Sequence, residues 1–185
     1  MGRIKNFVRE EVLDKAIQVF WEKGFADTSL SDLEKATGVN KSGLYSEFKD
    51  KEDIFHESIK RYRDIHPGYK ILEVTPLGWH NIEMFMKSFM TCKGKKGCFF
   101  INSIRDTAIL PTKTSKLMSE NGLSVLEMIS KNLKAAGLKT HTEIAAKMIT
   151  SFAGGVSLKL NAMKADDLFD EVDEFLKLMK TTYKL

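Results

Sequence analysis

The sequence has few residues that interrupt helices and few that form disulfides. Its 185 residues include three prolines, 12 glycines and two cysteines. So few prolines favour long helices. The two cysteines, Cys92 and Cys98, are too few for the disulfide framework of a small secreted protein, and they indicate a reducing compartment. We therefore expect a helical, cytoplasmic protein.

Long apolar runs and a strong charge of one sign are also missing. The longest stretch without a charged residue, 148–158, is well short of the roughly 20 residues that cross a bilayer. No apolar run follows the first residues, so the pattern of a signal peptide is absent. We expect no contact with membranes. The net charge of +4 permits contact with nucleic acid without requiring it.

Apolar residues recur at helical spacing through the chain. Val8, Val12, Ala16 and Phe20 begin this pattern, and Gly24 ends its first run. Residue types that cap or end helices then mark three more helices, at about 30–37, 41–48 and 51–65. The sequence shows no strand-like alternation. It therefore predicts an all-α fold.

The second half continues in the same way after residues 67–78, which hold two prolines and two glycines and are predicted to form a loop. Further helices are predicted at 82–89, 98–108, 117–136, 144–163 and 168–179. We divide the chain into a three-helix N-terminal domain, 1–50, and a helical C-terminal domain, 51–185. The helix at about 51–65 links the two domains.

A tight turn at Gly38 between two short helices is typical of the helix-turn-helix, a DNA-binding motif. The third helix would expose one polar face, and a helix of this width fits the major groove of DNA. That face consists of Lys41, Ser42, Gly43, Tyr45 and Ser46. For Tyr45 the alternative is packing beside Leu44.

The order of residues is more specific than that of a general helix-turn-helix. It runs Lys23-Gly24-Phe25, Thr28-Ser29-Leu30, Asp32-Leu33, Ala36-Thr37-Gly38-Val39-Asn40-Lys41-Ser42-Gly43-Leu44-Tyr45, Phe48 and Lys51-Glu52. This order closely resembles the TetR family of bacterial transcriptional regulators. Glu34 and Thr37 depart from the family pattern, which usually has alanine at both packing positions. A weaker resemblance, in Gly97-Cys98 and Asn102, is to the ligand-binding domain of one large TetR subgroup.

The resemblance implies a homodimer that binds a palindromic operator in double-stranded DNA, with the third helix in the major groove. It assigns base contacts to the polar face named above. It assigns phosphate contacts to Thr28, Ser29, Lys51, Arg3 and Lys5. Residues 1–51 hold nine basic and nine acidic side chains, so binding would depend on where the cations lie rather than on net charge.

The resemblance also implies a C-terminal domain that dimerises and binds an effector. The predicted dimer surface consists of Met148, Phe152, Gly155, Val156, Leu168, Val172, Phe175 and Met179. The helices before it are rich in aromatic residues and methionine, which indicates an adaptable apolar interior with an effector pocket. The predicted pocket lining is Trp79, Phe85, Phe89, Phe100, Asn102, Arg105, Met118 and Phe152. For both sets the alternative is packing inside the subunit.

We therefore expect a transcriptional repressor that a small apolar or amphipathic effector releases from its operator. Two alternatives stay open. Cys98 follows Lys93, Lys95 and Lys96, which would favour a reactive thiolate and make the protein a redox or electrophile sensor. The other alternative is a constitutive DNA-binding factor that has no effector.

Motifs of catalysis are missing from the sequence. It contains no phosphate-binding loop, no dinucleotide-binding glycine pattern and no nucleophile elbow. The four histidines and two cysteines lack the spacing of metal ligands. We therefore expect no enzymatic activity, no cofactor and no metal site.

Overall fold

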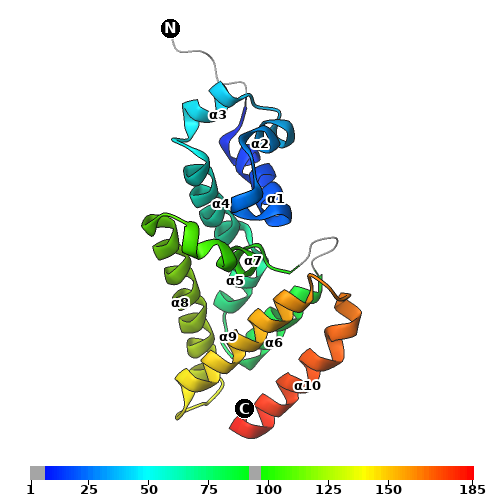
Figure 1. Ribbon diagram of the computed structural model, residues 1–185. Coiled ribbons are helices and arrows are strands. Elements are labelled where there is room, and N and C mark those ends of the chain that lie inside the picture. Colours follow the sequence, from blue (N-terminus) through cyan, green and yellow to red (C-terminus); the bar gives the residue numbers. More distant parts are fainter. Residues whose placement is uncertain (1–6, 92–96) are drawn as a thin grey trace. The chain divides into compact units, whose positions relative to one another are not determined.

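The computed structural model describes residues 7–91 and 97–185, and every regular element in these two ranges is a helix (Figure 1). The all-α prediction is therefore confirmed. The chain divides into two compact units. The N-terminal unit runs to Ile65 and also contains Asn102–Met118, whereas the C-terminal unit comprises His66–Ile101 and Ser119–Leu185. Among the described helices, none combines the length and apolar character that crossing a membrane requires.

The N-terminal unit is built on the four helices that the sequence predicts. They are α1 (Arg9–Asp27), α2 (Leu30–Thr37), α3 (Lys41–Glu47) and α4 (Lys51–Ile65). The 3-10 helix η2 (Ile104–Ile109) and the first turns of α8 (Thr112–Ala135) also belong to this unit. Aromatic side chains fill its core, where the rings of Phe20 and Phe55 meet edge to face with centroids 5.0 Å apart.

Local capping fixes where α2 and α3 begin. The Ser29 hydroxyl oxygen accepts from the Asp32 N–H at 3.1 Å, and the Asp32 carboxylate accepts from the Ser29 N–H at 2.9 Å. Hydrogen bonds from Lys23 and Ser29 lower the pKa of Asp32, so this cap stays ionised. Asn40 caps α3 by accepting from the Gly43 N–H at 2.8 Å.

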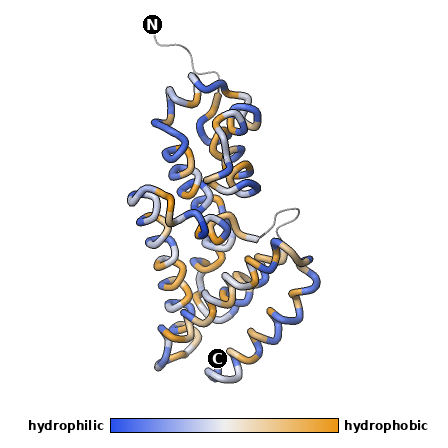
Figure 2. The backbone as a smooth tube through the Cα atoms, in the orientation of Figure 1, coloured by the Kyte–Doolittle hydropathy of each residue, from blue (hydrophilic) through white to orange (hydrophobic). Residues whose placement is uncertain are grey.

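The C-terminal unit holds the remaining helices. They are α5 (Pro67–Glu73), α6 (Trp79–Ser88), η1 (Phe89–Thr91), α9 (Thr142–Lys159), α10 (Ala165–Tyr183) and the rest of α8. The short helix α7 (Phe99–Ser103) begins in this unit and ends in the other. Hydrophobic and hydrophilic residues alternate along these helices (Figure 2), as amphipathic helices require. Buried residues such as Ile82, Met86, Ile129 and Ile149 form the core.

The predicted loop at residues 67–78 is wrong in its first half, because α5 begins there. Pro67 occupies the first turn of α5, where the missing N–H of proline is harmless. The ring of His66 caps the helix, since its Nδ1 accepts from the Gly68 N–H at 3.1 Å. Helix α8 likewise begins earlier than predicted, directly after Pro111. The predicted helix at 98–108 consists of α7 followed by η2.

Gly24 changes the direction of the chain near the end of α1. Its φ of 82° and ψ of 169° lie in a region that only glycine adopts readily. A Cβ at Gly24 would also lie 2.4 Å from Nη2 of Arg105. The backbone conformation requires glycine at this corner between α1 and α2, whereas the exposed end of the Arg105 side chain can move aside.

We expect Gly24→Ala to lower the free energy of unfolding by at least the roughly 1–3 kcal/mol of such backbone strain. Gly38→Ala is the matched control, because Gly38 also has a positive φ but a Cβ there would meet nothing within 4 Å. Urea unfolding followed by circular dichroism measures both variants. Equal destabilisation would show that the close approach of Arg105 is unimportant.

Candidate DNA-binding site and cavity

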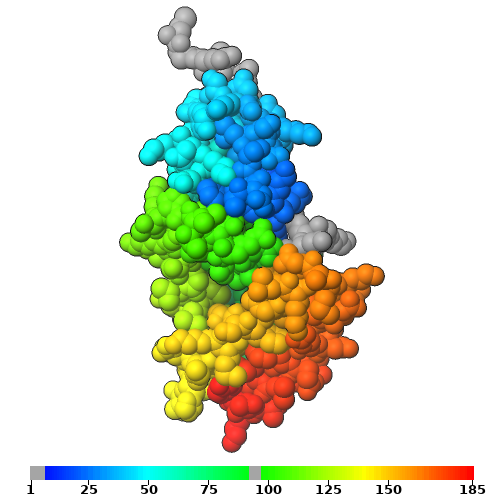
Figure 3. Space-filling view, viewed as in Figure 1, coloured from blue at the N-terminus to red at the C-terminus, as the bar shows by residue number. Residues whose placement is uncertain are grey.

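The outer face of α3 carries the side chains that the sequence predicts to read DNA. Lys41, Ser42, Tyr45 and Ser46 are exposed, whereas Leu44 is buried. Tyr45 is 43% exposed, so it does not pack into the core. The Lys41 ammonium lies 5.7 Å from the centroid of the Tyr45 ring. In the space-filling view the atoms of α3, in cyan, lie at the surface (Figure 3).

Gly43 keeps the start of α3 compact. A Cβ at this position would lie 2.7 Å from Cγ1 of Val39 and 3.3 Å from Oδ1 of Asn40. Glycine therefore lets the turn pack closely against α3. The Lys41 N–H donates to the Glu34 carboxylate, which joins α2 to the same turn. These contacts fix the direction in which the exposed face points.

The residues predicted to contact phosphate have different surroundings. Thr28 is 1% exposed and its hydroxyl donates to the Gly24 carbonyl at 2.6 Å, so this hydroxyl already has an acceptor inside the protein, and contact between Thr28 and a phosphate stays a prediction. Ser29 is exposed, but Asp32 occupies both its hydroxyl and its N–H. Arg3 and Lys5 lie outside the described residues.

Lys51 has a structural role that the sequence did not reveal. Its ammonium donates to the carbonyls of Phe25 and Thr28, each at 2.8 Å, and lies 4.4 Å from the centroid of the Phe25 ring. It therefore ties α4 to the corner between α1 and α2. Contact between Lys51 and a phosphate stays a prediction.

A second contact on this corner comes from a distant part of the sequence. Oδ2 of Asp106 accepts from the Phe25 N–H at 2.8 Å, and Nη2 of Arg105 donates to the Lys23 carbonyl at 3.4 Å. Asp106 is buried, and its partner is 81 residues away in the chain. No local pattern announces such a contact. The only signal was a charged pair within a largely apolar stretch.

The same segment also meets α4 within the N-terminal unit. The Nδ1 atom of His56 lies 3.1 Å from the Thr114 hydroxyl oxygen. Burial, and after it the nearby charges of Lys113 and Lys60, lower the pKa of His56. This histidine is therefore neutral at pH 7. Residues 102–118 thus contact both α1 and α4.

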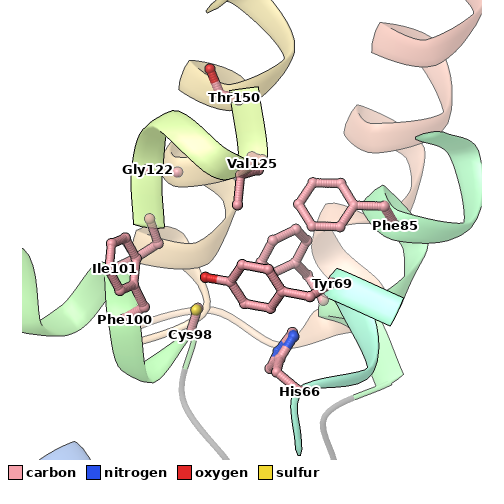
Figure 4. A pocket seen from close by; sticks show the side chains of 12 residues that line it. His66, Tyr69, Phe85, Cys98, Phe100, Ile101, Gly122, Val125 and Thr150 are labelled. Atoms are coloured by element: carbon pink, nitrogen blue, oxygen red, sulfur yellow. The ribbon is translucent and has the colours of Figure 1, made fainter. Parts of the chain in front are cut away.

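The C-terminal unit contains a cavity of about 570 Å³, which includes solvent at its mouth. Figure 4 shows side chains from several helices around this space. The lining consists of His66, Tyr69, Phe85, Phe89, Cys98, Phe100, Ile101, Gly122, Val125, Thr150, Ala153 and Gly154. Phe85, Phe89 and Phe100 are the predicted lining residues that contribute to it.

The other predicted lining residues lie elsewhere. Asn102, Arg105 and Met118 belong to the N-terminal unit. Trp79 is buried and its indole N–H donates to Glu83 at 2.6 Å. Phe152 stacks on Phe175, with ring centroids 3.8 Å apart and planes at 7°. The predicted lining therefore contained too many residues, because several of the large apolar side chains pack helices against one another instead.

Cys98 lines the cavity and is 8% exposed. Its backbone N–H donates to the Ser157 hydroxyl oxygen at 2.8 Å. A Cβ on Gly97 would lie 2.3 Å from the Ser157 carbonyl oxygen, so glycine lets α9 approach closely here. The three lysines that suggested a reactive thiolate lie outside the described residues.

Half of the predicted dimer surface is core instead. Val156, Leu168, Val172 and Met179 are at most 4% exposed within a single chain, so they cannot form a surface. Their predicted role is wrong because α9 and α10 pack their apolar stripes on the unit itself. Met148 and Gly155 are exposed, and Phe152 and Phe175 are half-buried. Leu158, Phe169 and Leu178 are exposed apolar residues of α9 and α10 that the sequence analysis did not assign to this surface.

The described residues contain no group of three or more His, Cys, Asp or Glu side chains that could hold a metal ion. The arrangement is that of a helical protein with an N-terminal helix-turn-helix. Residues 12–58 match the model of the family described as "Bacterial regulatory proteins, tetR family". The N-terminal segment of this chain is therefore a TetR-family DNA-binding domain.

Curated relatives match in the same segment. The HTH-type transcriptional repressor ComR of Escherichia coli is 48% identical over 63 residues, which are 34% of this chain and 30% of ComR. The uncharacterized regulator YezE of Bacillus subtilis is 42% identical over 62 residues, 34% of this chain and 32% of YezE. The match thus spans about a third of the length of these relatives.

Solved structures match over nearly the whole chain. A cysteine mutant of the TetR family regulator CifR complexed with 26-bp operator DNA has a TM-score of 0.80 and 20% identity, and the match covers 95% of this chain and 98% of CifR. The reduced form of E. coli NemR has a TM-score of 0.78 and 18% identity, and the match covers 94% and 95%. These likenesses establish the TetR-family fold. ComR, YezE and CifR are described as transcriptional regulators, which agrees with the expectation that this chain is not an enzyme.

We expect Asp106→Ala to lower the free energy of unfolding by about 1–3 kcal/mol, because the buried Phe25 N–H loses its acceptor. Asp106→Asn retains a side-chain oxygen and should recover part of this loss. The exposed Asp27 of the same unit provides the control, Asp27→Ala. Urea unfolding measures stability, and hydrogen exchange at the Phe25 amide should accelerate in Asp106→Ala. Unchanged exchange would contradict the role of this contact.

Proposed function

We propose that this protein is a sequence-specific transcriptional regulator that acts as a homodimeric repressor. Each α3 would enter a major groove of a palindromic operator. The observation that carries this proposal is the exposed polar face of α3, supported by caps and a close-packed turn, in a segment that matches the TetR family.

The distribution of charge supports a role for particular cations. Arg9 is paired with Glu57 at 2.9 Å, and Lys23 with Asp32 at 2.5 Å. Lys41, the first residue of α3, and Lys49, which follows its C-cap Phe48, are exposed. Phosphate contacts by such lysines would release counterions, so affinity would fall steeply as salt rises.

Selection of bound fragments from the source genome tests this function. The parent protein should enrich a palindromic site, and Lys41→Ala/Tyr45→Ala should not. On the enriched site the double variant should lose about 1–3 kcal/mol of binding free energy per base contact. Loss of a phosphate contact at Lys41 should also reduce the slope of log affinity against log salt concentration by about one.

Lys139→Ala is the control, because Lys139 is an exposed cation of the C-terminal unit. It should bind the site like the parent protein. Enrichment without any palindrome, or equal enrichment by the double variant, would contradict reading of bases by α3. The constitutive DNA-binding alternative would then be preferred.

Exposed apolar residues on α9 and α10 support the homodimer. Met148 of α9 is 46% exposed, and Leu178 of α10 is 58% exposed. The hydroxyl of Tyr183 lies 3.7 Å from Sδ of Met148, so the two helices meet at this face. A two-fold dimer would bury this face and match the symmetry of a palindrome.

We expect Met148→Asp and Leu178→Asp each to convert the dimer, of about 42 kDa, to the 21.0 kDa monomer, because a buried unpaired charge is costly. Leu123→Asp is the matched control, since Leu123 is 58% exposed on α8. Sedimentation equilibrium measures the mass. A parent protein that is monomeric at tens of micromolar, or an equal effect of Leu123→Asp, would contradict this interface.

The cavity supports control by a small apolar or amphipathic effector. Its described lining is mostly apolar and aromatic with a few polar side chains, which is usual for small-molecule sites. Such a space favours a ligand-responsive regulator over a constitutive factor. The redox alternative uses the same cavity, because Cys98 lines it.

A further inference from the structure

The chemistry of the cavity in the C-terminal unit defines the class of its ligand. We propose that the cavity binds an uncharged aromatic molecule of about two fused rings. This proposal rests on the proposed effector function of the cavity. It adds the charge and the shape of the ligand.

The described lining of the cavity carries no charged side chain. None of its 12 described residues is a lysine, arginine, aspartate or glutamate. His66 is its one imidazole, and its Nδ1 accepts a hydrogen bond from the Gly68 N–H at 3.1 Å. A ring nitrogen that accepts carries no proton, so this imidazole is neutral. A charged ligand would lose its hydration here without gaining a counterion.

Arg105 does not change this conclusion. It was the one cation among the residues predicted to line a pocket. Its guanidinium lies in the N-terminal unit, where it donates to the Lys23 carbonyl. An anionic ligand such as a carboxylate therefore finds no cationic partner among the described side chains that line the cavity.

The shape of the lining favours a flat ligand. Four aromatic side chains line the cavity: Tyr69, Phe85, Phe89 and Phe100. The rings of Phe85 and Phe89 meet edge to face at 75°, with centroids 5.2 Å apart. Flat aromatic molecules pack well against such rings, either stacked or edge to face.

Two glycines leave room in the lining. Gly122 of α8 and Gly154 of α9 line the cavity, and a Cβ at either would meet nothing within 4 Å. Figure 4 shows Gly122 and Val125 across the cavity from His66, and it shows the Tyr69 hydroxyl pointing toward Cys98. A polar substituent on the ligand would find its hydrogen-bond partners near the Tyr69 hydroxyl and Cys98.

Three ligands of nearly equal shape test the proposal: uncharged 1-methylnaphthalene, cationic N-methylquinolinium and anionic 1-naphthoate. Isothermal titration calorimetry and ligand-observed NMR are performed on the full chain without DNA. We expect 1-methylnaphthalene to bind once per chain, at least about tenfold more tightly than either ion, a difference of roughly 1.4 kcal/mol.

Substitutions that fill the cavity locate the binding. Gly122→Phe and Gly154→Leu should each weaken binding of 1-methylnaphthalene by at least about tenfold. Leu123→Phe introduces the same phenylalanine side chain one residue away, at an exposed position outside the lining, and should leave affinity within about threefold. Circular dichroism establishes that each variant is folded, and the two filling variants lie on different helices.

Tighter or equal binding of either ion would overturn the proposal, and tighter binding of the cation would assign the rings to cation–π contacts instead. Absence of binding by all three ligands would overturn it too. So would unchanged binding in both filling variants. Operator binding is measured separately, so a protein that binds DNA but not the uncharged ligand retains the DNA-binding function and loses only this inference.

Discussion

The corner between α1 and α2 is the constraint on which the candidate DNA-binding surface depends. Gly24 turns the chain there with a backbone conformation that other residues avoid. The Phe25 N–H is held by Asp106, and the Phe25 carbonyl is held by Lys51. Helix α2 starts at Leu30, five residues after Phe25, and leads through the Gly38 turn into α3. The direction of the exposed face of α3 therefore depends on contacts at a buried corner that itself reads no DNA.

The chain joins this corner to the cavity by a short path. Phe100 and Ile101 line the cavity, and Asp106 lies six residues after Phe100. Helix α7 and the 3-10 helix η2 follow each other directly between these residues. Under the proposed function, a ligand that shifts α7 would act on the segment that holds the Phe25 N–H. Effector release needs a difference in ligand affinity between two arrangements of this segment.

The sequence predicted the N-terminal helices well because their signals are local. Ser29 with Asp32, Gly38, and Asn40 with Gly43 act within a few residues, and they fixed α2 and α3. Pro67 misled the prediction, because a proline in the first turn of a helix has the same sequence signature as one in a loop. Asp106 could not be foreseen, since its partner is 81 residues away. Val172 and Phe175 share one apolar stripe, and only packing shows that the first is buried and the second half-buried.

The central claim is that two copies of α3 read two successive major grooves. Dimethyl sulfate protection on a bound operator tests it most directly, because the reagent methylates guanine N7, which lies in the major groove. The account predicts two symmetric clusters of protected guanines, with centres about 10–10.5 base pairs apart or a multiple of that spacing. A single cluster of protected guanines would contradict it. So would unprotected guanines on an operator to which the protein is bound.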